Sequence, residues 1–153
     1  MEKIIKVSDL ISQKYIIDIK ADTKVGALNE LLAVICENPN ITNRKVFEKA
    51  IFDREKLMST GIGYGVAVPH ARDKSVKDFV IAIGRKQKGL EYESIDDKPV
   101  KLIFMIGASD NQDKAYIKLL SRLVLRLKNR DFFDALLQAA NPEDIYDLIH
   151  KTK

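Results

Sequence analysis

Residues 54–72 read Arg54-Glu55-Lys56-Leu57-Met58-Ser59-Thr60-Gly61-Ile62-Gly63-Tyr64-Gly65-Val66-Ala67-Val68-Pro69-His70-Ala71-Arg72. A charged segment leads into alternating glycines, then into a short apolar run that stops at Pro69 and His70. Proline has no N–H for a sheet ladder, and it pushes Val68 into extended geometry, so a strand is predicted to end here. The pattern therefore predicts a histidine held at the mouth of a sheet, where it can receive a transferable group.

His70 is one of only two histidines in the chain. A neutral imidazole can attack phosphorus if an acceptor holds its far nitrogen and if cations or N–H groups receive the phosphoryl oxygens. The predicted suppliers are Arg54, Lys56, Arg72 and the amides of a phosphate-binding loop at Gly61, Gly63 and Gly65. The alternative is that these glycines form only a tight turn that feeds a strand. They match neither a Walker A loop nor a G-x-G-x-x-G fingerprint, since no lysine follows and Val66 replaces the third glycine.

Other chemistries find less support in the sequence. One cysteine and two histidines are too few for a zinc site unless carboxylates dominate, so neither a metal nor another cofactor is expected. A Ser59–His70 nucleophile pair lacks the usual nucleophile turn and an orienting acid. Cys36 is expected in the core, and His150 on the surface of a terminal helix.

The composition is that of an ordinary globular protein, with 46% hydrophobic and 31% charged residues among 153. Residues 1–153 are predicted to form a single domain. A signal peptide and a membrane span are not expected, which favours the cytoplasm. The net charge of +4 is spread along the chain, so no nucleic-acid interface is expected. One basic concentration is interpreted as a solvated helix face, or else as a docking surface for an acidic partner: Lys114, Lys118, Arg122, Arg126, Lys128 and Arg130.

Hydrophobic periodicity predicts the order of strands and helices. Apolar runs predict strands at 15–19, 66–68, 79–83 and 100–107, and a turn at Lys88-Gly89 followed by a short edge strand at 90–92. Helical spacing predicts helices over 25–35, 42–56 with Thr42 as its cap, 117–127, 132–137 and 142–149. The predicted fold class is α/β: a small mixed β-sheet flanked by helices on both faces.

Residues 54–57 and 59–70 closely resemble the active-site signature of enzyme IIA from the bacterial sugar phosphotransferase system. The match is to the fructose/mannitol (type 2) class, which includes a stand-alone nitrogen-regulatory branch. The signature is long and specific, and the resemblance extends over most of the chain to the ending Asn141-Pro142-Glu143-Asp144-Ile145-Tyr146. It implies a mixed sheet flanked by helices.

The resemblance also implies a phosphocarrier activity. His70 would accept a phosphoryl group from the phosphohistidine of the carrier protein HPr and pass it to a cysteine of a cognate enzyme IIB, while Arg54 would stabilise the phosphate. Tyr116 stands where the family commonly has a second histidine. A tyrosine hydroxyl can donate a hydrogen bond, but it carries no positive charge. The alternative is a regulatory module whose phosphorylation state controls partner binding.

A docking surface for HPr is predicted from exposed apolar residues of the loop. Met58, Ile62 and Tyr64 are the candidates, because a surface loop otherwise has little reason to carry such side chains. No direct membrane insertion is expected.

Overall fold

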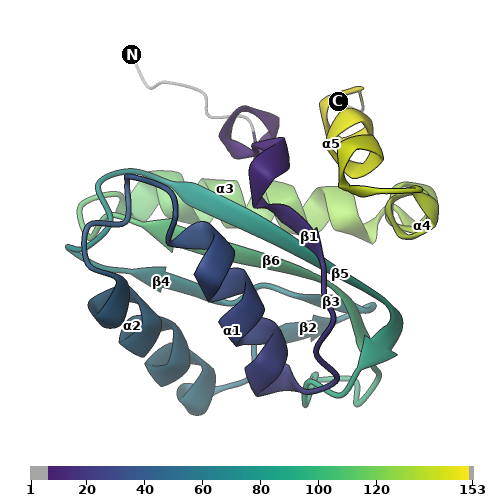
Figure 1. Cartoon of the computed structure of the whole chain (residues 1–153), viewed down its shortest axis with the longest axis horizontal. Helices are drawn as coiled ribbons and strands as arrows, with labels where there is room; N and C mark the ends of the chain where they lie inside the picture. Colours follow the sequence, from purple (N-terminus) through teal and green to yellow (C-terminus); the bar gives the residue numbers. More distant parts are fainter. Residues whose placement is uncertain (1–6, 152–153) are drawn as a thin grey trace.

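The computed structural model describes residues 7–151, and these form a six-stranded mixed sheet with helices on both faces (Figure 1). The sheet order is β1-β5-β6-β3-β2, and β4 also pairs with β6. β5 and β6 are antiparallel, while β1 runs parallel to β5, and β3 and β4 run parallel to β6. The strands are β1 (Ile16–Asp18), β2 (Gly61–Gly63), β3 (Val66–Ala67), β4 (His70–Arg72), β5 (Val80–Leu90) and β6 (Val100–Ala108).

The helices divide between the two faces of this sheet. α1 and α2 lie on one face and α3 on the other (Figure 1), and α4 and α5 share the hydrophobic cluster of α3. Two short 3₁₀ turns open the described chain. The elements are η1 (Val7–Leu10), η2 (Gln13–Tyr15), α1 (Lys24–Ile35), α2 (Arg44–Leu57), α3 (Asp113–Lys128), α4 (Arg130–Gln138) and α5 (Pro142–Lys151). The predicted α/β class is therefore confirmed.

The central strands bury both of their faces, which explains their near-continuous apolar sequences. Ile81 and Phe104 belong to the cluster under α3, α4 and α5. Ala82 and Met105, one residue further along each strand, belong to the cluster under α1 and α2. Two hydrophobic clusters thus lie on opposite sides of one sheet.

Side-chain caps start α1 and α2, as expected for residues that accept bonds from the first orphan N–H groups. Thr23 accepts from the Gly26 amide at 3.1 Å, and Asn43 accepts from the Val46 amide at 3.2 Å. The prediction that Thr42 caps α2 is wrong by one residue. The Thr42 hydroxyl instead donates to the carbonyl of Ser75 at 2.9 Å and ties the helix start to the loop after β4.

The predicted turn at Lys88-Gly89 and the separate strand at 90–92 are also wrong. β5 continues to Leu90, which pairs with Val100 of β6 across a register shift. Gly89 has φ +80°, a conformation that disturbs the strand without ending it. Tyr92 lies beyond the strand and is fully buried.

No helix in residues 7–151 combines the length and the apolar composition needed to cross a bilayer. The first six residues, on which the signal-peptide expectation chiefly rests, lie outside the described part of the chain.

Candidate functional site

His70 opens β4, a short strand that pairs with the central strand β6. β3 pairs Val66 with Leu102, and β4 pairs His70 with Ile106, so both short strands use β6 as their neighbour. Pro69 lies between them, and its carbonyl accepts the Ile106 amide at 2.9 Å. The prediction that a strand ends at Pro69 was therefore incomplete. The ladder loses one N–H at Pro69 and resumes at His70, which anchors the histidine backbone to β6.

One nitrogen of the His70 ring is held and the other is not. Nδ1 lies 2.7 Å from the carbonyl oxygen of Val68. Because a carbonyl can only accept, Nδ1 must carry the proton in this contact, and the neutral ring keeps its lone pair on Nε2. Nε2 has no hydrogen-bond partner within residues 7–151, and the side chain is only half-buried. This is the tautomer that a nucleophilic histidine needs.

The surroundings favour the neutral ring. Burial is the largest effect and lowers the pKa of His70, while the hydrogen bond to Val68 opposes it. The positive charges of Arg54 and Arg72 lower the pKa further, and the carboxylate of Glu55 raises it. An uncharged imidazole beside two guanidinium groups is suited to meet an incoming anion.

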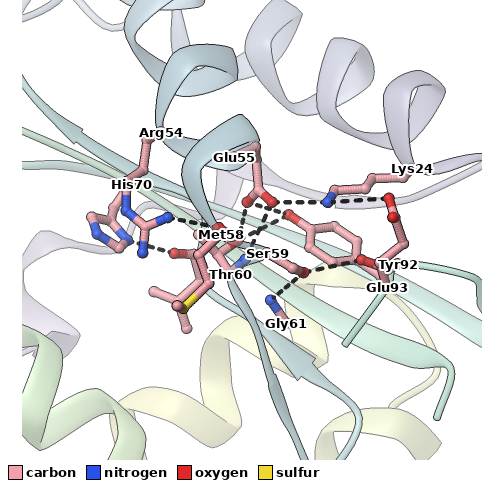
Figure 2. Close-up of polar contacts among 11 residues, drawn as sticks. Lys24, Arg54, Glu55, Met58, Ser59, Thr60, Gly61, His70, Tyr92 and Glu93 are labelled. Carbon is pink, nitrogen blue, oxygen red and sulfur yellow. Dashed lines mark hydrogen bonds and ion pairs between the residues drawn. The ribbon is translucent and has the colours of Figure 1, made fainter. Parts of the chain in front are cut away.

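Arg54 lies in the last turn of α2, and its guanidinium lies beside His70 in Figure 2. Its NH1 donates to the carbonyl of Met58 at 2.7 Å, which also satisfies an orphan carbonyl at the helix end. This contact fixes the side chain while leaving the other N–H groups of the guanidinium without a partner in the described chain. The structure thus brings together His70 and Arg54, as predicted.

Glu55, the next residue, organises the back of the site and was quoted in the signature without a role. Its carboxylate is buried and accepts from the Thr60 amide at 3.2 Å, from the Thr60 hydroxyl, and from the Tyr92 hydroxyl at 2.9 Å (Figure 2). Lys24 of α1 completes the cluster, with its Nζ 2.9 Å from the carboxylate and 4.4 Å from the centre of the Tyr92 ring. These contacts lock the end of α2 to the segment that leads to β2.

Sequence reasoning missed this cluster for a physical reason. Lys24, Glu55 and Tyr92 lie far apart in the chain, and only the folded sheet brings them together. One local signal existed, because an acidic residue in the last turn of a helix opposes the helix dipole and needs a partner.

Tyr116, on the first turns of α3, is also brought to His70. The two ring centroids lie 5.7 Å apart at an interplanar angle of 55°, and the Arg72 guanidinium lies 5.6 Å from the centre of the tyrosine ring. Tyr116 is 7% exposed, and its hydroxyl has no hydrogen-bond partner within the described chain. Burial raises the pKa of this hydroxyl, so the tyrosine stays protonated and remains a donor. A buried donor without a partner is costly, which marks a position where a ligand can complete the bonding.

The glycines lie elsewhere. Gly63 and Gly65 form the β2–β3 hairpin with φ values of +93° and +79°. The β6 partners of Val66 and His70 lie four positions apart, a distance of about 13 Å at strand spacing, so this hairpin does not surround the histidine. Gly61 is nearer, but its amide already donates to Ser59 Oγ at 3.1 Å, and a Cβ there would lie 2.9 Å from the Ser94 backbone. Turn geometry and packing thus account for all three.

The predicted apolar docking residues lie in two places, one near Arg54 and two in the β2–β3 hairpin. Met58 is 66% exposed and lies at the end of α2 beside Arg54 (Figure 2), next to the still more exposed Leu57. Ile62 is half-buried, and Tyr64 is exposed at the hairpin tip, away from His70. Leu57 was not predicted, because its place in the helical pattern did not reveal its exposure.

Within residues 7–151, no group of three His, Cys, Asp or Glu side chains is arranged to hold a metal ion. Cys36 is half-buried against the cluster under α1 and α2, where burial raises the pKa of its thiol. His150 is exposed on α5, and its Nδ1 lies 2.8 Å from the Tyr146 carbonyl.

The sequence of residues 10–152 matches the family described as phosphoenolpyruvate-dependent sugar phosphotransferase system, EIIA 2. The chain belongs to this family. This EIIA type 2 chain is 31% identical to a nitrogen regulatory protein of Bradyrhizobium diazoefficiens. The alignment spans 144 residues and covers 94% of each sequence. It is also 31% identical to a fructose-specific EIIA component of Haloferax volcanii, over 83% of this chain and 82% of that one.

Longer relatives contain a similar segment. The chain is 34% identical to part of the fructose-specific EIIABC component of Bacillus subtilis, matching over 95% of its own length but only 23% of that protein. EIIA proteins of this kind are components of the phosphotransferase system.

Solved structures confirm the EIIA fold. The nitrogen regulatory protein IIA-Ntr of Neisseria meningitidis superposes with a TM-score of 0.85 at 26% identity, covering 94% of this chain and 98% of that one. The mannitol enzyme IIA of Escherichia coli, in its complex with phosphorylated mannitol enzyme IIB, gives a TM-score of 0.79 over 92% and 97%. At 20% identity, the latter likeness shows the fold alone.

Proposed function

We propose that this EIIA chain accepts a phosphoryl group on His70 Nε2 from the phosphohistidine of HPr and transfers it to a cysteine of an enzyme IIB. The observation that carries the proposal is the Nδ1 contact with the Val68 carbonyl, which leaves Nε2 as the available nucleophile. Family membership supports it, and so does one structural neighbour, a mannitol enzyme IIA in complex with phosphorylated enzyme IIB.

The transfer consists of two balanced displacements at phosphorus. The Nε2 lone pair forms the new N–P bond while the donor's N–P bond breaks and its electron pair returns to the donor imidazole. The recipient thiolate then forms an S–P bond while the His70 N–P bond breaks and its pair returns to Nε2. Nδ1 keeps its proton throughout. The Val68 carbonyl strengthens its hydrogen bond whenever the ring becomes positive.

Two groups are proposed to bind the transferred phosphoryl oxygens. Arg54 is pre-positioned by its bond to the Met58 carbonyl and supplies positive charge with little rearrangement. The Tyr116 hydroxyl lacks a partner in the unmodified protein and would donate to a phosphoryl oxygen. We therefore propose that Tyr116 replaces the hydrogen bond, but not the charge, of the histidine that the family commonly carries.

The partners are proposed to dock on the apolar end of α2. Leu57 and Met58 are exposed beside Arg54, and large apolar side chains are enriched at the centres of protein interfaces. The hairpin residues Ile62 and Tyr64 remain predicted contacts only for a partner that extends to that end of the sheet.

Phosphoryl acceptance can be tested directly. The purified protein is incubated with phosphoenolpyruvate, enzyme I and HPr, and acid-labile phosphate is measured by mass spectrometry. Wild type and the matched control His150→Ala, which changes an exposed histidine on α5, are expected to accept one phosphoryl group. His70→Ala is expected to accept none. Equal labelling of His70→Ala and wild type contradicts the proposal.

A regulatory role is the second candidate, and the likeness to nitrogen regulatory proteins supports it. On this proposal the phosphorylation of His70 controls the binding of a target protein. Immobilised wild type and His70→Ala are compared for proteins retained from the source cells, with and without prior phosphorylation. A target other than enzyme IIB that binds both unphosphorylated forms and is released on phosphorylation of wild type supports regulation. Retention of enzyme IIB alone supports the transport relay.

A further inference from the structure

A groove of about 680 Å³ lies at the hairpin end of the sheet, separate from His70. Its walls come from the β2–β3 hairpin, the loop before β6 and the start of α4. The lining includes Tyr64, Ile95, Asp96, Lys98, Lys101, Arg130 and Phe133. The proposed phosphoryl relay uses none of these side chains.

The groove has an apolar side built from exposed rings and chains. Tyr64 is 60% exposed and Ile95 is 70% exposed, although both are large and apolar. Tyr64 also has φ +59°, an unfavourable conformation for a residue with a side chain. An exposed aromatic ring thus lines the groove, where a flat ligand group can stack against it.

Arg130 provides a cation that is held beside Tyr64 by direct contacts. Its NH1 donates to the Tyr64 carbonyl at 3.1 Å, and its guanidinium lies 4.0 Å from the centre of the Phe133 ring and 5.9 Å from that of Tyr64. The remaining N–H groups of Arg130 bond to no described residue. A guanidinium held by these contacts keeps further N–H groups that can donate to an oxyanion.

The balance of charge in the groove is positive. Lys98 and Lys101 add to Arg130, and Asp96 is the only carboxylate in the lining. Asp96 is committed to the protein, because its two oxygens accept the Tyr64 and Lys98 amides at 3.1 Å each. These bonds lower the pKa of Asp96, so it stays ionised as a structural clamp between the hairpin and the loop.

We propose that this groove binds a mononucleotide, with the phosphate against Arg130, Lys98 and Lys101 and the base against Tyr64. The volume is within the usual range for small-molecule sites, roughly 300–1,000 Å³. A fixed guanidinium and two ammonium groups fit a phosphate, and the exposed aromatic ring fits a planar base. A phosphate alone would not use the exposed aromatic ring, and a base alone would not use the three cations.

Nuclear magnetic resonance titration of the whole chain with AMP tests this proposal. Saturable shifts are expected in the amides of Tyr64, Gly65 and Lys101, but not in that of His70. Inorganic phosphate and adenosine each carry one half of the recognised chemistry, and each is expected to bind at least about tenfold more weakly than AMP. Equal binding of phosphate and AMP overturns the role of the base, and no shift at these amides with AMP overturns the site.

Variants separate binding from folding. Arg130→Gln is expected to weaken AMP binding about tenfold, as is typical for the loss of one charge-assisted contact. Lys98→Gln removes a charge from an exposed side chain and is expected to weaken binding severalfold without disturbing the hairpin. Arg44→Gln, an exposed arginine on α2, is the matched control and should bind AMP like wild type. Unchanged affinity in both Arg130→Gln and Lys98→Gln contradicts the proposal.

Discussion

Nδ1 of His70 lies 2.7 Å from the carbonyl oxygen of Val68, two residues earlier in the chain. The contact spans Pro69, so the same peptide segment that interrupts the strand also selects the tautomer of the ring. A backbone acceptor has no proton to offer and cannot be removed by substituting a side chain. The path of the main chain therefore specifies Nε2 as the nitrogen that is left open.

Replacing Arg54 tests whether its charge acts on the phosphoryl group. Arg54→Gln is expected to slow phosphoryl transfer from HPr about 100-fold, comparable to the loss of one transition-state donor in other enzymes. Rapid-quench measurement of His70 labelling gives the rate. Arg44→Gln is the control on the same helix, and an unchanged rate in Arg54→Gln would exclude Arg54 from the reaction.

The pH dependence of His70 follows from its lowered pKa. The unfolded chain, with an ordinary histidine pKa of about 6.5, binds the proton more tightly than the folded chain, so this group's contribution to stability is complete above that pH and is lost as the pH falls. Phosphoryl acceptance should likewise stay constant above about pH 6.5 and decline only at lower pH. Titration of the His70 ring by nuclear magnetic resonance should give a midpoint below 6.5; a higher midpoint contradicts the assigned environment.

The buried carboxylate of Glu55 should matter for stability more than an exposed one. Glu55→Gln weakens the contacts to Lys24 and Thr60 and is expected to lower the free energy of unfolding by about 2–3 kcal/mol. Glu48→Gln, which breaks an exposed pair with Arg44, should lower it by about 0.5 kcal/mol or less. Urea unfolding measures both, and equal effects would show that the buried cluster adds no more stability than an exposed ion pair. Because the Glu55 charge raises the pKa of His70, that pKa should also fall in Glu55→Gln.

Tyr116 offers a test in which stability and activity move separately. Tyr116→Phe removes a hydroxyl that has no partner, so the free energy of unfolding should stay the same or rise by up to about 1 kcal/mol. The rate of phosphoryl acceptance should nevertheless fall about tenfold through loss of a donor to the phosphoryl oxygens. Tyr116→His, which supplies a ring N–H, should retain more activity than Tyr116→Phe. Equal activity in wild type and Tyr116→Phe contradicts the proposed contact.

The docking surface can be examined through Met58. Met58→Asp places a charge in the proposed apolar contact and should raise the KM for HPr about tenfold or more, with little change in stability because the side chain is exposed. Leu125→Asp is the matched control, an exposed apolar residue on α3. Equal KM values for Met58→Asp and wild type would show that HPr does not dock at the end of α2.

The sequence was sufficient for the fold class because its strands are apolar on both faces and its helices have caps and periodic stripes. It failed at Gly89, a residue typical of turns that lies in an irregular part of β5, because the strand pairs with β6 again at Leu90. It also grouped the three glycines with His70 because they are close in sequence. In the sheet, the β2–β3 hairpin and His70 lie at different positions along β6, and local sequence patterns do not reveal this separation. The Glu55–Tyr92 contact depends on tertiary structure, and the only local sign of it is an acidic residue in the last turn of α2, which does not identify the partner.

The short strand that carries His70 has a consequence for the order of events in the proposed relay. Its backbone is paired with the central strand β6, so the histidine cannot move between two separate partner-binding positions. With a single open nitrogen at a fixed location, donor and recipient compete for the same space. In the proposed relay, the phosphoryl donor must therefore dissociate before the recipient binds. A ternary complex of this chain with donor and recipient together cannot form at His70.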